Sequence, residues 1–128
     1  MTGVTTRSSV NSMRAFVPAR DLALSKCFYR ELGFEVVWEA HDACGLRIDG
    51  CSFILQQFYI KEHAGNFMMA LDVEDVDAWW RHIASLQLPE RYELAVIKAP
   101  EQQPWGLRVL FLSDPSGVLW HIAQHPRA

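Results

Sequence analysis

Apolar residues follow the same order of spacings twice along this chain. In the first half, a mixed apolar stretch over 11–17 is typical of a strand, and a helical pattern follows over 22–32, with Asp21 as candidate N-cap. Stretches rich in Val, Ile, Phe and Trp then predict strands over 34–39, 45–48 and 51–58. The first half is therefore expected to be a β-α-β-β-β module over about 11–60.

The second half repeats this order over about 66–124. A strand is predicted over 67–73, and Asp75 is a candidate N-cap for a helix. The apolar residues of that helix recur every 3.6 positions, at Val76, Trp79, Trp80, Ile83 and Leu86. Further strands are expected over 92–97, 107–112 and 118–123, with a Pro- and Gln-rich loop over 99–105 and a turn over 114–117. Shifting one half onto the other places Asp21 on Asp75, which favours an internal duplication.

The two modules are expected to share one structure. A module of about 60 residues with a single helix buries too little apolar surface to be stable alone. We therefore expect a single α+β domain over residues 1–128, built from two paired modules.

Composition and charge narrow the range of partners. The 128 residues carry 12 Lys and Arg against 15 Asp and Glu, a net charge of −3, with no basic stripe that could follow a phosphate backbone. The chain has no apolar run near the length of a membrane span, and its first ten residues lack the apolar centre of a signal peptide. We expect no nucleic-acid partner, no membrane association and a cytoplasmic location.

Three motifs resemble a known superfamily. They are Arg20-Asp21-Leu22, the run from Phe28 to Phe34, and Asp114-Pro115-Ser116-Gly117 before an apolar strand. The chain resembles the vicinal oxygen chelate superfamily of glyoxalases, extradiol dioxygenases and antibiotic-resistance proteins. The resemblance implies paired βαβββ modules that form a curved mixed sheet with helices outside and a cleft inside. Gln103-Pro104-Trp105-Gly106, with His121 in the last strand, resembles the bleomycin resistance proteins in particular.

The resemblance also marks four positions at which metal-dependent relatives bind a divalent ion. In this chain these positions fall on Arg14, Gln56 or Gln57, Met68 and His121. A guanidinium has no lone pair to give, and a thioether is too soft for the oxygen and imidazole shells of such ions. We therefore expect no metal, no other cofactor and no catalytic residue. The alternative is a metal-dependent lyase or dioxygenase with an atypical site.

Bleomycin resistance proteins imply a different activity, which is sequestration of a large cationic glycopeptide antibiotic without chemical change. The resemblance predicts a homodimer with aromatic-lined clefts, in which Trp105 stacks on the ligand. A second aromatic position of that family falls near Ala43, which has no ring, so Trp38 is expected to replace it. The predicted ligand-binding residues are Trp105, Trp38, Arg14, Phe16, Gln56, Phe58, Met68 and His121.

Strand alternation assigns most of these residues to one face. If Val17, Phe53, Leu55, Phe67, Met69, Leu71, Trp120 and Ile122 face the helices, then Arg14, Phe16, Gln56, Phe58, Met68, Ala70 and His121 face the cleft. Alternative roles stay open at this point. Trp105 could instead anchor its loop, His121 could be a structural residue, and Arg14 could pair with an acidic neighbour. Gln56 and Gln57 cannot both point into the cleft, and the register that decides between them is open.

Overall fold

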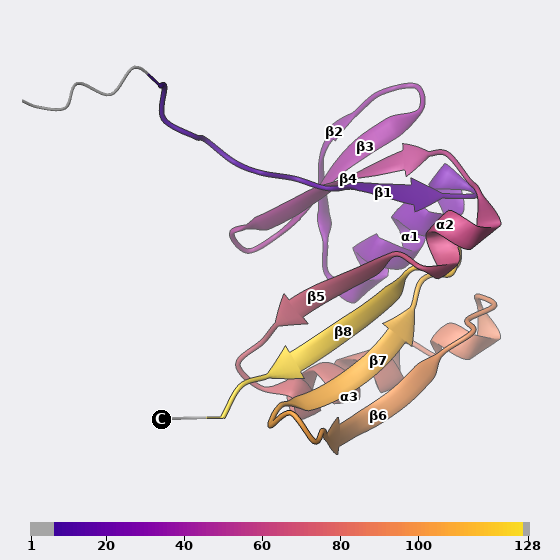
Figure 1. The fold of residues 1–128 in the computed structure, drawn as a ribbon. Coiled ribbons are helices and arrows are strands. Elements are labelled where there is room, and N and C mark those ends of the chain that lie inside the picture. The colour runs from indigo at the N-terminus through magenta and orange to yellow at the C-terminus, as the bar shows by residue number, and fades with distance from the viewer. Residues whose placement is uncertain (1–6, 127–128) are drawn as a thin grey trace, which may run out of the picture.

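Two β-α-β-β-β series follow one another in the computed structural model, which describes residues 7–126 (Figure 1). The first series consists of β1 (Phe16–Ala19), α1 (Leu22–Leu32), β2 (Glu35–Glu39), β3 (Ala43–Ile48) and β4 (Cys51–Gln57). The second consists of β5 (Met68–Asp72), α3 (Val76–Ser85), β6 (Ile97–Gln102), β7 (Arg108–Ser113) and β8 (Leu119–Gln124). The short helix α2 (Lys61–Gly65) links the two series, and a 3-10 turn (Leu88–Glu90) follows α3. Neither of these two short elements was expected from the sequence.

Each series forms its own four-stranded mixed sheet. Sheet 1 has the strand order β1-β4-β3-β2, and sheet 2 has the matching order β5-β8-β7-β6. In both sheets the first pair is parallel and the other two pairs are antiparallel. The α+β class and the repeated βαβββ module are therefore confirmed. Within one chain the strands are divided between two separate sheets.

The first strand begins later than expected. The sequence pattern predicts a strand over 11–17 that ends before Pro18, but β1 spans Phe16–Ala19 and contains Pro18. Its length is set by β4, because only these four residues of the first segment pair with β4. Because β1 lies at the edge of sheet 1, the missing N–H of Pro18 breaks no ladder.

The strand predicted over 92–97 is also wrong, because β6 spans Ile97–Gln102 and occupies part of the expected loop. Tyr92 instead packs in the core, with its ring centroid 5.3 Å from that of Phe28. The β6–β7 ladder is irregular between Lys98 and Glu101, and Pro100 lies in that interval. An edge strand with a bulge can accommodate a proline. The Pro- and Gln-rich composition of the segment therefore predicted a loop where the structure has a strand.

Both predicted N-caps are confirmed. The Asp21 carboxylate accepts a hydrogen bond from the Leu24 amide at 3.2 Å, and the Asp75 carboxylate accepts one from the Ala78 amide at 3.0 Å. Each carboxylate satisfies an amide that the first helical turn leaves without a backbone partner. The duplication seen in the sequence thus extends to the way in which both long helices begin.

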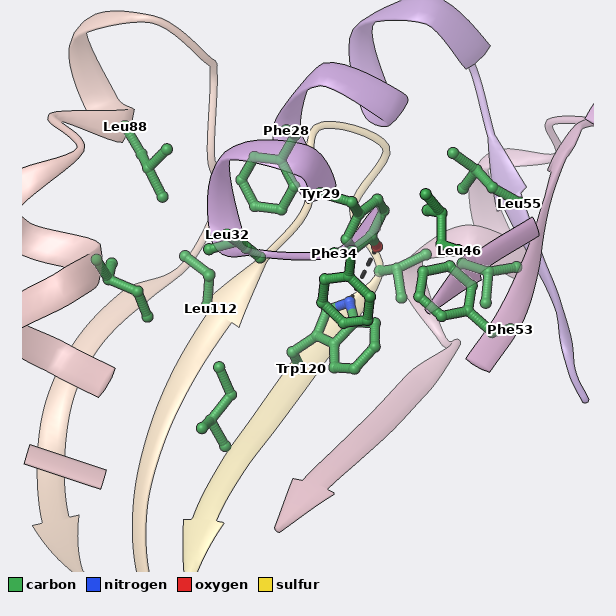
Figure 2. Close-up of a cluster of buried hydrophobic side chains, with 14 of the residues drawn as sticks. Phe28, Tyr29, Leu32, Phe34, Leu46, Phe53, Leu55, Leu88, Leu112 and Trp120 are labelled. Atoms are coloured by element: carbon green, nitrogen blue, oxygen red, sulfur yellow. Dashed lines mark hydrogen bonds between the residues drawn. The ribbon is translucent and has the colours of Figure 1, made fainter. Parts of the chain in front are cut away.

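One hydrophobic core lies between the two series. Side chains from α1, from β3 and β4, and from β7 and β8 point toward one another in this core (Figure 2). Its fully buried large side chains include Phe28, Tyr29, Leu46, Phe53, Leu55, Ile83, Leu110, Leu112 and Ile122. The aromatic members meet mostly edge to face, which is a favoured geometry for such rings. Residues of both series thus contribute to the same core.

A buried hydrogen-bond network joins the two series through this core. The Tyr29 hydroxyl donates to a carboxylate oxygen of Asp114 at 2.6 Å. It also accepts from the indole N–H of Trp120 at 2.9 Å (Figure 2). The other Asp114 oxygen accepts from the backbone amides of Ser116 and Val118 at 2.8 and 3.0 Å. The Asp-Pro-Ser-Gly motif is therefore a turn, as predicted, and its aspartate also holds α1 against sheet 2.

None of the helices in the described part of the chain is long and apolar enough to cross a membrane.

Candidate functional site

Each sheet turns one face toward the core and leaves the opposite face, here called its outer face, without a covering helix. In sheet 1, Val17 and Leu55 are fully buried, whereas Phe16 is 56% exposed. In sheet 2, Trp120 is buried, whereas Met68 is 62% exposed. In Figure 1, α3 lies behind sheet 2, so the view is onto the outer face of that sheet. The alternation predicted from the sequence therefore correctly separates core from outer face at these positions.

A row of apolar side chains crosses the outer face of sheet 1. Phe16 on β1 pairs with Ile54 on β4, Ile54 pairs with Gly45 on β3, and Gly45 pairs with Trp38 on β2. Trp38 is 37% exposed, and Ile54 is almost buried within the row. Two of the predicted ligand-binding residues, Phe16 and Trp38, thus lie in one row from opposite edges of the sheet.

The structure decides between Gln56 and Gln57. The Gln57 side chain accepts a hydrogen bond from the Leu22 amide at 2.8 Å and donates to the Arg20 carbonyl at 2.7 Å, so it holds the start of α1. Gln124 makes the matching contact in the second series, since its side chain accepts from the Val76 amide at 2.9 Å. Gln56 pairs with Ala43 on the outer face and makes no side-chain hydrogen bond within residues 7–126. Gln56 is therefore the glutamine that is free to meet a ligand.

His121 lies at the centre of the outer face of sheet 2. It pairs with Ala70 on β5 and with Phe111 on β7, and Phe111 pairs in turn with Lys98 on β6. The His121 and Phe111 rings meet edge to face, with centroids 4.8 Å apart. The buried Nε2 atom of His121 has no hydrogen-bond partner among the described residues. An unpaired buried polar atom costs free energy, so this nitrogen is a candidate contact for a ligand.

Trp105 projects from the tight connection between β6 and β7. The Gly106 amide donates to the Gln103 carbonyl at 3.0 Å, and Gly106 has a φ of 97°, which favours glycine. The indole of Trp105 is 61% exposed. A side chain that exposed packs too little to anchor its own loop, so the geometry favours a role in contacting something outside the chain.

Arg14 and Phe58 lie just outside the strands of sheet 1, at opposite ends of the parallel β1–β4 pair. Arg14 is exposed in the segment before β1 and forms no ion pair within the described part of the chain, so the salt bridge considered from the sequence is not formed there. Phe58 follows β4, is 47% exposed and bridges to Ala19 through its backbone. Both residues are therefore exposed, but at opposite ends of the sheet.

Within one chain, the predicted ligand-binding residues form two groups on separate sheets. Phe16, Trp38, Gln56, Arg14 and Phe58 belong to the side of sheet 1, and Met68, His121 and Trp105 belong to sheet 2. No hydrogen bond or aromatic contact joins the groups among residues 7–126. A hollow of about 590 Å³ lies elsewhere, between the turn at 114–117 and residues 89–97.

The residues at the four metal positions do not fit an ion. Arg14 precedes β1 and offers no lone pair, Met68 offers a soft thioether, and of the two glutamines only Gln56 is free. His121 is the one good donor of the set. In the part of the chain that the structure describes, no group of three or more His, Cys, Asp and Glu side chains is placed to hold a metal ion.

Sequence reasoning missed three contributors to these faces, which are Gly45, Ile54 and Phe111. Strand pairing places them beside Trp38, Phe16 and His121. Ile54 and Phe111 had a signal in the sequence, since each alternates with buried residues on both sides, whereas Gly45 had none.

Comparison with known proteins identifies the family. Residues 11–122 match the family described as the glyoxalase/bleomycin resistance protein/dioxygenase superfamily. The chain belongs to this superfamily. A bleomycin resistance protein from Klebsiella pneumoniae is 29% identical over 113 residues, which cover 85% of this chain and 88% of that protein.

Solved structures of superfamily members share the fold. A bleomycin resistance determinant encoded on the transposon Tn5 matches with a TM-score of 0.78 and 24% identity, covering 92% of this chain and all of that one. The bleomycin-binding protein from bleomycin-producing Streptomyces verticillus, solved with copper(II)-bleomycin, matches with a TM-score of 0.72 and 19% identity. That match covers 93% of this chain and all of the other. These structures confirm the fold expected from the sequence, and the family match over residues 11–122 confirms the superfamily.

Proposed function

We propose that this superfamily member is a non-catalytic binding protein that sequesters a small antibiotic molecule in the cytoplasm. The observation that carries the proposal is the pair of uncovered outer faces, which carry aromatic side chains and unpaired polar groups. Phe16, Trp38 and Trp105 supply exposed ring surface, and Gln56 and His121 supply polar atoms without partners in the described chain. Aromatic walls with a few polar groups are typical of small-molecule sites.

The relatives support an antibiotic as the ligand. The Klebsiella pneumoniae relative is a bleomycin resistance protein, and two structural neighbours are described as complexes with bleomycin or copper(II)-bleomycin. A net charge of −3 suits a cationic ligand of that kind. The residues that replace the metal ligands of other superfamily members, Arg14 and Met68, favour binding over metal-assisted chemistry.

The proposal includes a homodimer. In one chain the two sheets turn their core faces toward the same core, so their outer faces cannot close on each other. A cleft enclosed on two sides therefore needs a second copy, in which sheet 2 of the partner faces sheet 1. Phe16 and Met68, which are 56% and 62% exposed, would lose water contact in such an assembly.

Replacement of Trp105 tests the binding function. We expect copper(II)-bleomycin to bind the wild-type protein and Trp105→Ala to weaken binding by about 30-fold, because a desolvated tryptophan at a binding site typically contributes about 2 kcal/mol or more. Isothermal titration gives the affinity, and tryptophan fluorescence follows the same titration. Tyr59→Ala is a matched control, since Tyr59 is an exposed aromatic outside the proposed site. If micromolar copper(II)-bleomycin produces no binding heat and no fluorescence change with the wild-type protein, this antibiotic is not the ligand.

Sedimentation tests the dimer. Each chain has a mass of 14.7 kDa, so at micromolar concentration we expect a species of twice that mass. A double variant with Phe16→Ser and Met68→Ser removes apolar surface from both outer faces and should shift the protein toward the monomer. A wild-type protein that sediments only as a single chain would contradict the two-sided cleft.

A further inference from the structure

Trp38 reaches the outer face of sheet 1 because the ladder between β2 and β3 contains one extra residue. The register shifts between Val36 and Trp38, which leaves Val37 without a partner and sets Trp38 opposite Gly45. A regular ladder would set Trp38 opposite Cys44, which is 1% exposed and faces the core. A slip of one residue moves a side chain to the other face of a sheet. The bulge at Val37 therefore places the indole on the outer face.

Gly45 provides the space in which that indole lies. A Cβ atom at position 45 would lie 2.6 Å from Cδ1 and 2.7 Å from Cε2 of Trp38, and closer still to Nε1. These three atoms belong to the five-membered ring, so this ring covers the backbone where another residue would carry its side chain. The geometry requires glycine here because of this close approach. The exposed 37% of Trp38 leaves ring surface available above the sheet.

We propose that Gly45 and the bulge at Val37 are positioning residues that hold the Trp38 indole against sheet 1 as a stacking wall for a planar aromatic part of the ligand. This inference rests on the proposed binding function and deepens it, because it names the residues that place the expected stacking residue Trp38. Ile54 and Phe16 extend the same row and complete an apolar floor beside the indole. A flat ring that stacks on this floor is desolvated on one side by the indole.

The test is a double-mutant cycle between positions 45 and 38, with copper(II)-bleomycin and the planar cationic dye proflavine as probes. Gly45→Ala should weaken binding by about fivefold to tenfold, the range expected for loss of one aromatic stack. In a Trp38→Ala background, the same Gly45→Ala change should alter the affinity by less than about twofold, because the group that it displaces is already absent. Equal weakening in both backgrounds would overturn the proposal.

Gly65→Ala serves as the matched control. A Cβ at Gly65 meets no atom within 4 Å, so the same chemical change is made without a clash and should leave both affinities unchanged. Thermal unfolding of all variants shows whether Gly45→Ala has lost its fold. If it has, the contact between the Trp38 indole and Gly45 in the wild-type protein decides the positioning role instead.

A measurement without ligand separates this proposal from the proposed function. In the free wild-type protein, the indole protons of Trp38 should show strong nuclear Overhauser effects to the Gly45 Hα protons. Their absence would overturn the positioning role even if bleomycin binds. If the contacts are present but neither probe binds the wild-type protein, the proposed function fails together with the stacking role, while the placement of Trp38 by Gly45 is supported.

Discussion

Phe53→Ala should lower the free energy of unfolding by about 4 kcal/mol, within the range found for buried Phe-to-Ala changes. Phe53 is 2% exposed, and its ring centroid lies 5.1 Å from that of Tyr29 and 5.6 Å from that of Trp120. These neighbours come from both series and are tied to each other by a hydrogen bond. Because they cannot move freely into the vacated space, most of the cavity should remain.

Phe58→Ala is the matched control for Phe53→Ala. Phe58 follows the same strand but is 47% exposed at the margin of the outer face, so its loss should change stability by less than about 1 kcal/mol. Urea denaturation gives both values, and the two variants should differ clearly in midpoint. Comparable losses in the two variants would contradict the division between core face and outer face on which the candidate site depends.

Tyr29→Phe should cost about 3 kcal/mol at neutral pH, although it removes a single oxygen atom. Without the hydroxyl, a buried Asp114 oxygen loses its donor and the Trp120 indole N–H loses its acceptor. Asp114 is 1% exposed and Trp120 is 3% exposed, so water cannot easily replace the missing group. Denaturant unfolding should show the loss as a shift in midpoint with an unchanged slope.

Tyr92→Phe removes the same atom in a different setting and is the control for Tyr29→Phe. The Tyr92 hydroxyl donates to Glu31 at 2.9 Å. Burial, together with this bond, raises the pKa of Tyr92 to about 12. The Glu31 carboxylate also pairs with Arg91, so it keeps a partner in the variant. We expect a loss of about 1 kcal/mol, and a loss equal to that of Tyr29→Phe would show that the network between the series has no special weight.

The same network sets the pH dependence expected of Asp114. Burial raises the pKa of Asp114 above 3.8, although the bond from Tyr29 and the bonds from the amides of Ser116 and Val118 lower it. The folded chain therefore binds this proton more tightly than the unfolded chain. The free energy of folding that protonation of Asp114 contributes is fully present below pH 3.8. It is lost as the pH rises through the pKa of Asp114 in the folded chain.

Titration of the Asp114 carboxyl carbon by NMR measures this pKa directly. Tyr29→Phe should raise the pKa of Asp114 further, because the hydroxyl bond favours the charged form. A wild-type midpoint at or below 3.8, or no rise in the variant, would contradict the account of the network. The predicted rise also distinguishes lost hydrogen bonding from a general loosening of the core, which would let water reach the carboxylate and lower its pKa.

Much of the architecture follows from local patterns in the sequence. Helical spacing and the caps Asp21 and Asp75 predict both long helices correctly, since a helix start depends on residues within a few positions of one another. Strand alternation correctly assigns Phe53 to the core face and Phe16 to the outer face, because alternation also depends only on neighbouring residues. The bounds of β1 and β6 could not be predicted, because an edge strand extends only as far as its partner pairs with it.

The superfamily, the repeated module and the core-facing positions were thus determined by the sequence alone, because each depends on residue type and on spacing within one segment. Tertiary structure decided which glutamine is free, because Gln57 is engaged by α1 and Gln56 is not. It also decided that Trp38 lies over Gly45, since one unpaired residue in a ladder changes the face of every residue beyond it. Pairing between strands far apart in the chain leaves no periodic mark in either strand, and it becomes visible only in the folded protein.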